Sequence, residues 1–184
     1  MIYVLHVMTG KELDVRDELR RVPYTAMVPR EITLERKDGQ VVGKERTLFA
    51  SYVFVDMVMD LQAYYKIRSI QHVIKFLGGT SPAKLSGTEA KYIEWLANGG
   101  KPLQPSEIDK DGKIIFGPLV GNEAYVVKMD RRARRAKLRV TLAGASQEIN
   151  LSVIDAQLTD TLPVAAAAPP DGGTDEGDNA PTEQ

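Results

Sequence analysis

Cysteine is absent from this chain of 184 residues, and histidine occurs only twice. Without cysteine there is no disulfide framework, no thiolate metal site and no thiol nucleophile. His6 and His72 lie far apart in the sequence, and neither has an obvious acidic or hydroxyl partner. Because metal sites need clustered ligands, we expect no metal ion and no cofactor.

Sequence motifs that are typical of enzymes and of membrane-spanning or secreted proteins are absent as well. The sequence contains no phosphate-binding glycine loop with a lysine, no Gly-x-Ser-x-Gly turn and no paired-carboxylate pattern, so we do not expect an enzyme. The N-terminus lacks the charged lead and apolar run of a signal peptide. No apolar stretch approaches the roughly 20 residues that cross a bilayer. A cytoplasmic protein without a membrane partner is expected.

Acidic residues are unevenly distributed, although the net charge of the whole chain is only −1. Residues 159–184 contain six acids and neither lysine nor arginine. Residues 1–158 therefore carry 24 basic and 19 acidic side chains (25 less these six), a net charge of +5. The tail, 159–184, is rich in Ala, Pro, Gly and polar residues. It cannot bury enough apolar surface to offset its ordering entropy, so we expect an acidic disordered tail.

Residues 1–100 alternate short apolar strands with amphipathic helices, which is typical of an α+β sandwich. Two helix starts are marked by the spacing of a capping box, in which a hydroxyl residue precedes a glutamate by three positions. The first pair is Thr9 and Glu12, and the second is Ser86 and Glu89. These signals place a helix after the first strand and another at the end of the domain.

A hairpin and a central strand are expected inside this domain. Asp38-Gly39 lies between two extended segments and accepts the positive φ of a type I′ turn. A later run, Tyr-Val-Phe-Val, is apolar on both faces, which favours a central strand covered on both sides. Tyr52 and Phe54 would point to one face of this strand, and Val53 and Val55 to the other.

The pattern changes after residue 100. Residues 101–108 contain two prolines and no periodicity, and we interpret them as a linker. Residues 109–158 consist of short apolar segments separated by turn residues, without a helical stretch. About four or five short strands in such a segment indicate a small all-β, SH3-like barrel.

Positive charge is most concentrated in this second domain. The segment KMDRRARRAKLR, residues 128–139, holds seven cations and one acid. Clustered positive charge attracts phosphate backbones, and arginine forks pair with phosphate oxygens. From the residues alone, RNA, an acidic protein and a solvated turn all remain open as interpretations. The candidate nucleic-acid-binding residues are Lys128, Arg131, Arg132, Arg134, Arg135, Lys137 and Arg139.

In four segments the chain resembles the NusG family of transcription elongation factors. They are IYVLHVMTGKE, LFASYVFV, YKIRSIQHVIKFLGG and GPLVGNEAYVVKMDRR, in this order. The resemblance covers about residues 1–158 and implies an NGN-like N-terminal domain, a linker and a KOW barrel. Two departures stand out: Ala50-Ser51 replaces the usual Pro-Gly, and Ala124 replaces the usual KOW glycine.

The resemblance implies a monomeric factor that binds bacterial RNA polymerase at the clamp region of its largest subunit. Leu48, Phe49, Tyr52 and Phe54 would form the polymerase-binding surface; alternatively, Tyr52 and Phe54 pack beneath a helix of their own domain. The basic hairpin would bind nascent RNA, and cations of the first helix would face the non-template DNA strand or solvent. The basic hairpin is most similar to that of the LoaP-type antiterminator paralogues, which act on selected operons.

Two alternative functions remain open. A housekeeping NusG-type factor would use the barrel to couple polymerase to the ribosome or to a termination helicase. A ribosome-associated KOW protein would bind structured RNA without contacting polymerase. The first alternative predicts protein partners for the barrel, and the second predicts no polymerase binding.

Overall fold

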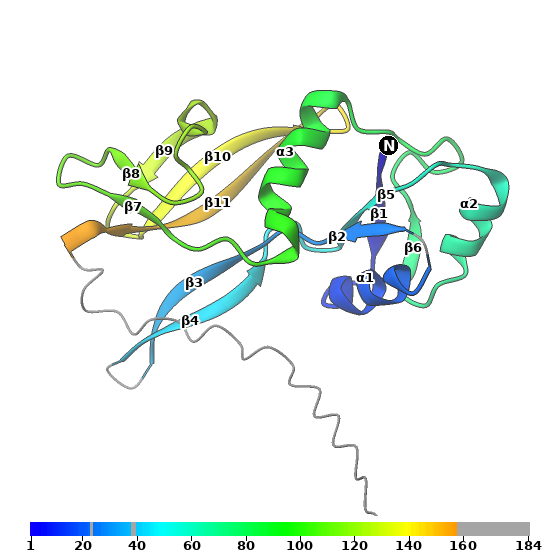
Figure 1. Ribbon diagram of the computed structural model, residues 1–184, viewed down its shortest axis with the longest axis horizontal. Helices are drawn as coiled ribbons and strands as arrows, with labels where there is room; N and C mark the ends of the chain where they lie inside the picture. Colours follow the sequence, from blue (N-terminus) through cyan, green and yellow to red (C-terminus); the bar gives the residue numbers. More distant parts are fainter. Residues whose placement is uncertain (23, 38–39, 158–184) are drawn as a thin grey trace, which may run out of the picture.

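The computed structural model describes residues 1–22, 24–37 and 40–157. The N-terminal part is an α+β domain in which strands and helices are interleaved, as the sequence predicted (Figure 1). Its elements are β1 (Ile2–Val7), α1 (Glu12–Arg20), β2 (Thr25–Met27), β3 (Arg30–Lys37), β4 (Gln40–Thr47), β5 (Tyr52–Asp56), α2 (Leu61–Arg68), β6 (Val73–Phe76) and α3 (Gly87–Ala97).

Four antiparallel strands form the N-terminal sheet, in the order β2-β5-β1-β6. Side chains alternate across this sheet, because a strand has a side-chain period of two. Val53 and Val55 pack with α1 and α2 on one face, whereas Val4 and Phe54 pack with α3 on the other. The predicted division of the β5 side chains between two faces is therefore confirmed.

Strands β3 and β4 form a separate hairpin that projects from the N-terminal domain (Figure 1). The pairing of the two strands runs from Arg30 with Thr47 to Lys37 with Gln40. Leu103, from the segment predicted as a linker, lies beside β3. Its N–H donates to the Arg30 carbonyl and its carbonyl accepts the Ile32 N–H, both at 2.8 Å. The segment after α3 is thus tied to the hairpin by backbone hydrogen bonds.

Helix α1 begins differently from the predicted capping box. The helix starts at Glu12, and the Thr9 hydroxyl lies 2.6 Å from the Ser51 hydroxyl instead of capping the helix. The Glu12 carboxylate accepts the N–H groups of Gly10 at 3.1 Å and of Ser51 at 2.7 Å. Ser51 has a φ of 68°, a left-handed conformation that favours glycine. Glu12 therefore stabilises the Ala50-Ser51 turn in the absence of a glycine.

The second predicted capping box is confirmed at the start of α3. The Ser86 hydroxyl accepts the Glu89 N–H at 3.3 Å, and the Glu89 carboxylate accepts the Ser86 N–H at 2.8 Å. Figure 1 shows α3, in green, between the N-terminal sheet and the C-terminal strands. The helix is therefore placed to contact both parts of the molecule.

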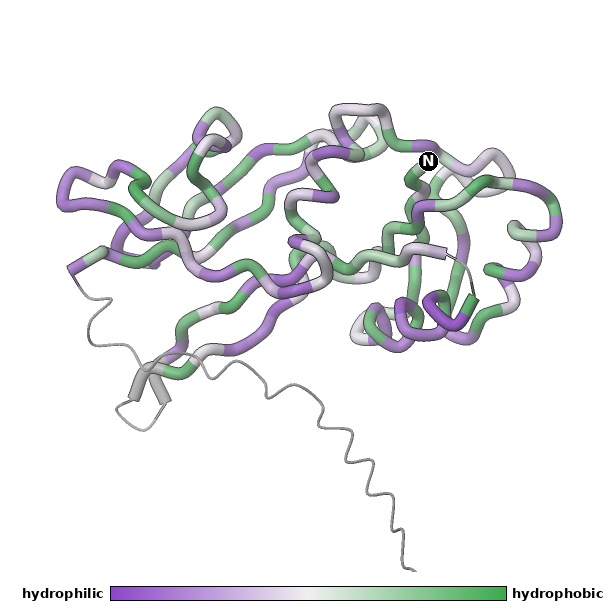
Figure 2. The backbone as a smooth tube through the Cα atoms, viewed as in Figure 1, coloured by the Kyte–Doolittle hydropathy of each residue, from purple (hydrophilic) through white to green (hydrophobic). Residues whose placement is uncertain are grey.

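The C-terminal part is a five-stranded sheet with the order β8-β7-β11-β10-β9. We call this sheet, residues 106–155, the C-terminal sheet. Hydrophobic and hydrophilic residues alternate along β10, and the hydrophobic ones are buried (Figure 2). This part is rich in β-structure, as predicted. Its strands are β7 (Ser106–Ile108), β8 (Ile114–Phe116), β9 (Val126–Asp130), β10 (Arg135–Leu142) and β11 (Ala145–Asp155).

Strand β7 lies within the segment that we interpreted as a linker. It pairs in parallel with β11 and antiparallel with β8. Ser106 is completely buried, and its hydroxyl accepts the Leu119 N–H at 3.1 Å. The sequence of β7, Ser-Glu-Ile, is too short to show an alternating pattern, and a proline precedes it. Its long-range pairing, rather than its own composition, makes it a strand.

The predicted acidic tail, 159–184, and the predicted turn at Asp38-Gly39 lie outside the described residues. Within the described ranges, no helix is long and apolar enough to cross a membrane.

Candidate protein and nucleic-acid interfaces

The predicted protein-binding aromatics lie around one face of β5 but differ in exposure. Phe54 is completely buried and Phe49 is nearly so, with their rings edge to face and centroids 5.4 Å apart. Tyr52 is partly exposed, and its ring lies 5.7 Å from that of His6. Leu48 is partly exposed as well. The two phenylalanines form a buried base, and Leu48 and Tyr52 provide the accessible surface above it.

Helix α3 covers the buried part of this face. Ile93 and Leu96 of α3 belong to the same buried cluster as Phe49 and Phe54. Phe54 thus packs beneath a helix of its own domain. Of the four predicted residues, only Leu48 and Tyr52 keep accessible surface.

Cations form a row on the outward face of the C-terminal sheet. Arg135, Lys137 and Arg139 alternate along β10 with buried apolar residues, so the three side chains share one face. Lys128 of β9 lies directly opposite Lys137. We call these four residues the cationic row. Like charges this close repel each other unless an anion lies between or above them.

Glu148 neutralises part of the cationic row. It pairs with Arg139 in the β10–β11 register, and its carboxylate accepts Lys137 Nζ at 2.9 Å and an Arg139 guanidinium nitrogen at 3.3 Å. The hydrogen bonds from Lys137 and then from Arg139 hold the pKa of Glu148 below its ordinary value. All three side chains are substantially exposed, so solvent screens these ion pairs.

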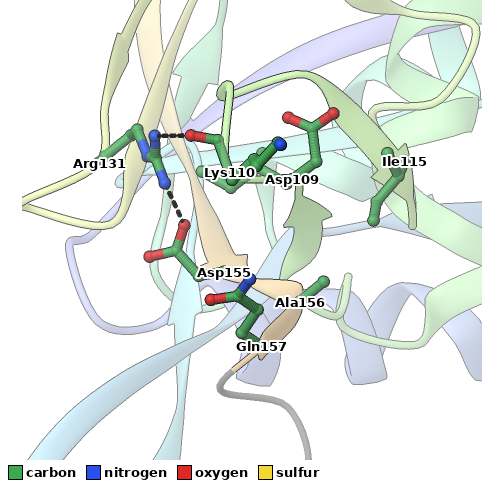
Figure 3. Close-up of a pocket in the computed structure, with 8 residues that line it drawn as sticks. Asp109, Lys110, Ile115, Arg131, Asp155, Ala156 and Gln157 are labelled. Carbon is green, nitrogen blue, oxygen red and sulfur yellow. Dashed lines mark hydrogen bonds and ion pairs between the residues drawn. The ribbon is translucent and has the colours of Figure 1, made fainter.

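Arg131 points toward the end of the C-terminal sheet and is held there. Its guanidinium donates to the Lys110 carbonyl and to the Asp155 carboxylate, the latter at 2.8 Å (Figure 3). These residues border an open pocket of about 560 Å³ that also includes Ile108 and Gln157. Arg131 therefore stabilises the turn between β7 and β8 and is less available to a ligand than its exposure suggests.

Two further arginines lie at the turn between β9 and β10. The Asp130 carboxylate accepts the Ala133 N–H at 2.8 Å, and Arg134 takes a φ of 55° to close the turn. Arg132 is exposed. Among the described residues, neither of these arginines nor Lys128 forms an ion pair. The charges of these three cations are therefore not neutralised by an acid of the described part of the protein.

Arg135 is bound by a buried acid that was not among the predicted site residues. Glu31 of β3 is only 1% exposed. Its carboxylate forms ion pairs with Arg46 and with Arg135, each at 2.9 Å, and Arg135 also donates a hydrogen bond to it. It also accepts the Ser152 N–H at 2.7 Å and the Ser152 hydroxyl at 3.0 Å. We call Glu31, Arg46, Arg135 and Ser152 the Glu31 cluster; no local sequence signal indicates a contact across such separations.

Helix α3 makes a second contact with the C-terminal part. The Trp95 indole N–H donates to the Pro118 carbonyl at 3.1 Å. The Tyr125 ring lies 5.2 Å from that of Tyr92 and 6.3 Å from that of Trp95, centroid to centroid. Burial raises the pKa of the Tyr92 phenol. The two parts of the molecule are therefore docked through this aromatic group as well as through the Glu31 cluster.

Comparison with known proteins gives relatives that match most of this chain. A family model described as transcription termination factor nusG matches residues 2–94. The transcription termination/antitermination protein NusG of Yersinia pestis is 32% identical over 164 residues, covering 81% of this chain and 91% of the relative. The chain belongs to the NusG family. The protein of the same name from Vibrio vulnificus is 30% identical, with 81% and 90% of the two chains covered.

A solved structure of a NusG protein shares the fold. It is described as a domain interaction in Thermotoga maritima NusG and matches with a TM-score of 0.51 and 24% identity, over 83% of this chain and 93% of that chain. Members of the NusG family are transcription factors and not enzymes, as the sequence predicted for this chain. Among the described residues, no group of three or more histidine or acidic side chains could hold a metal ion.

Proposed function

We propose that this NusG-family protein is an elongation and antitermination factor. In this proposal the N-terminal domain binds bacterial RNA polymerase, and the C-terminal sheet, a KOW-type barrel, binds nascent RNA. The observation that carries the proposal is the cationic row on β9 and β10, next to a turn with two further arginines that form no ion pair with any described residue. A fold of this family with concentrated positive charge on one face is suited to RNA leaving the polymerase.

The geometry of the row favours recognition of a phosphate backbone. Side chains two positions apart on a strand are separated by about 6.8 Å, twice the rise per residue. Arg132 and Arg134 extend the row beyond the end of the strands. Arginine and lysine at these positions contact phosphates without selecting a base. Recognition by shape of a folded leader RNA then supplies the selectivity.

The polymerase contact is proposed at Leu48 and Tyr52, supported by Phe49 and Phe54 below. A tyrosine over a packed aromatic base offers a large apolar contact at low entropic cost. The partner proposed is the clamp region of the largest polymerase subunit. Binding that prefers the closed clamp would shift the population away from paused states.

The arginine-rich turn supports a finer proposal, that the protein is a specialised paralogue of the LoaP type acting on selected operons in the cytoplasm as a monomer. A contact between α1 and the non-template DNA strand is less well supported. Lys11, Arg16 and Arg21 of this region are each paired with a neighbouring acid. Arg20, the fourth cation of this region, forms no ion pair with a described residue.

The RNA proposal is tested by neutralising the cations that the protein does not pair. Lys128→Gln, Arg132→Gln and Arg134→Gln together, in the full chain, should weaken binding of a folded leader RNA. The slope of log affinity against log salt should fall by roughly 0.7–0.9 for each lost phosphate contact. The matched control neutralises three exposed lysines of the N-terminal domain, Lys66, Lys84 and Lys91. Equal losses in the two triple variants would refute the site.

The polymerase proposal is tested at the accessible residues. Leu48→Ser with Tyr52→Ser should abolish co-purification with polymerase while the fold is retained. Phe54→Ala is unsuitable for this purpose, because removing a fully buried ring destabilises the fold itself. Val127→Ser, at an exposed apolar residue of the C-terminal sheet, is the control. Unchanged retention of the double variant would place the contact elsewhere.

One observation favours the housekeeping alternative as a second candidate. Exposed apolar side chains occur on and near the edge strands β8 and β9, namely Ile115, Phe116, Val120 and Val127. Exposed apolar groups near a sheet edge suit a protein partner, such as a ribosomal protein or a termination helicase. Phe116→Ser with Val120→Ser would then abolish capture of purified ribosomes or helicase and leave RNA affinity unchanged. A measurement of polymerase binding distinguishes both candidates from a factor that acts only on ribosomal RNA. Both candidates predict that the protein binds polymerase, and the ribosomal factor predicts that it does not.

A further inference from the structure

The polypeptide leaves the C-terminal sheet beside the arginine-rich turn that joins β9 to β10. The Val153 N–H of β11 donates to the Arg134 carbonyl at 3.0 Å, and two residues later the Asp155 carboxylate accepts from Arg131 at 2.8 Å. Gln157, at the end of the described residues, lines the same pocket as Arg131 and Asp155 (Figure 3). The part of the chain that follows is therefore attached next to the cations of this turn.

The cations near this point are opposite in charge to the segment that follows. Lys128, Arg132 and Arg134 form no ion pair with any described residue. The tail, 159–184, contains six acids and neither lysine nor arginine. Charge complementarity therefore makes the tail a suitable partner for these three cations. Its acids are Asp160, Asp171, Asp175, Glu176, Asp178 and Glu183.

The tail is long enough to reach all of the cationic row. An extended chain spans at most about 3.6 Å per residue, so Asp160 lies no more than roughly 11 Å from Gln157, and residues 158–184 can extend over roughly 90 Å. The stretch of β10 from Arg135 to Arg139 is only about 14 Å long. The first acid therefore stays near the turn, and the later acids can reach the whole row.

Attachment at the turn compensates for the weakness of each contact. A single ion pair between exposed side chains contributes little, because solvent and salt screen it. A partner that is attached nearby, however, is present at an effective concentration in the millimolar range. Several weak ion pairs at such a concentration occupy the cations for much of the time. A free acidic peptide at micromolar concentration would not do so.

We propose that the tail, 159–184, binds the cations Lys128, Arg132 and Arg134 and competes with nucleic acid for them. The contact itself does not depend on the RNA-binding function, whereas the competition rests on that proposed function. The tail lowers the affinity for every nucleic acid that uses these cations. At a given concentration, only ligands that make additional contacts then remain bound. The tail thus limits binding to phosphate backbones that are held by charge alone.

The contact is tested without RNA by carbodiimide crosslinking of the full-length protein, which joins a carboxylate to a lysine amine that touches it. Crosslinks between the tail acids and Lys128 are expected. The matched control is Arg132→Gln with Arg134→Gln, which keeps the reactive amine and the attachment of the tail but removes two of the three cations. The yield of these crosslinks should fall several-fold in the control. Equal yields would mean that attachment alone brings the tail close, and would overturn the inference.

The competition is tested by changing all six tail acids to their amides in the full chain. This variant should bind a labelled single-stranded RNA several-fold more tightly. Its salt slope should be steeper by up to roughly 2, because the tail no longer holds three cations that contribute about 0.7 each. In a background of Lys128→Gln, Arg132→Gln and Arg134→Gln, the same six changes should give no gain. An equal gain in both backgrounds would mean that the tail repels RNA without binding these cations, and would overturn the inference.

The two tests distinguish this inference from the proposed RNA function. Crosslinks that require Arg132 and Arg134, with no RNA binding by any variant, would support the contact and overturn the RNA function together with the competition. RNA binding that depends on the three cations, with crosslinks that do not require the two arginines, would overturn this inference and leave the RNA function intact.

Discussion

The indole N–H of Trp95 in α3 and the carbonyl oxygen of Pro118, 23 residues away in the C-terminal part, are joined by a hydrogen bond of 3.1 Å. The bond lies in an aromatic group completed by Tyr92 and Tyr125. Aromatic pairs of this kind add about 0.5–1.5 kcal/mol beyond their buried area. The two parts of this NusG-family protein therefore share a packed interface.

Tyr125→Ser should loosen that interface, because Tyr125 supplies the ring that Trp95 and Tyr92 contact from the C-terminal side. Trp95 emission should move to longer wavelength while the far-ultraviolet circular dichroism stays unchanged. Tyr65→Ser is the control, since Tyr65 is exposed on α2 and remote from the interface. An identical emission spectrum in Tyr125→Ser would contradict docking through this group.

Acid should weaken the contact made by Glu89. Burial alone would raise the pKa of Glu89, but hydrogen bonds from the N–H groups of Ser86 and Gly144 hold it below its ordinary value. A carboxyl whose pKa is lower in the folded state stabilises the fold at pH values above its unfolded pKa. This stabilisation is lost as the pH falls through the folded value. The difference in unfolding free energy between the unmodified protein and Glu89→Gln should therefore shrink in acid. A difference that does not vary with pH would contradict the assignment.

Glu148→Gln should increase RNA affinity, because it releases Lys137 and Arg139 of the cationic row. Fluorescence anisotropy with a labelled single-stranded RNA should show a salt slope steeper by roughly 1.4. Glu94→Gln makes the same charge change at an exposed position of α3 and should have little effect. Equal affinities of the two variants would mean that net charge, and not the row, governs binding.

Phe54→Ala and Tyr52→Ala should differ sharply in stability, although the residues are two positions apart. Phe54 is completely buried, so its loss should lower the free energy of unfolding by about 3–5 kcal/mol. Tyr52 keeps exposed surface, and its loss should cost about 1 kcal/mol. Chemical denaturation of both variants measures this difference. Similar losses would mean that Tyr52 is as much a core residue as Phe54, and the proposed polymerase surface would be lost.

Local patterns predicted the elements whose signals lie in adjacent residues. The capping box of Ser86 and Glu89 was correct because both partners are local. The alternation that separates Phe54 from Val53 also follows from strand geometry alone. The capping box at Thr9 was wrong because Ser51, 42 residues away, binds the Thr9 hydroxyl. There a tertiary contact replaced a local one.

In the candidate site, too, local features could be predicted from the sequence and long-range contacts could not. The cationic segment was visible in the sequence, and its placement on one face follows from the period of β10. What could not be predicted is which cations the protein pairs with its own acids. Glu31, Glu148 and Asp155 reach the segment from other strands, and their pairs with Arg135, Lys137 and Arg131 span 104, 11 and 24 residues. Strand β7 escaped prediction for a similar reason, since its pairing with β11 is non-local.

Crosslinking of nascent RNA provides the most direct test of the central claim, that the N-terminal domain holds polymerase while the cationic face contacts its RNA. The full-length protein would be bound to a halted elongation complex whose emerging RNA carries a photoreactive nucleotide. Crosslinks are expected in the peptide 128–139 and should be lost when Lys128, Arg132 and Arg134 are changed to glutamine. Crosslinks confined to other segments, or unaffected by these changes, would contradict the account.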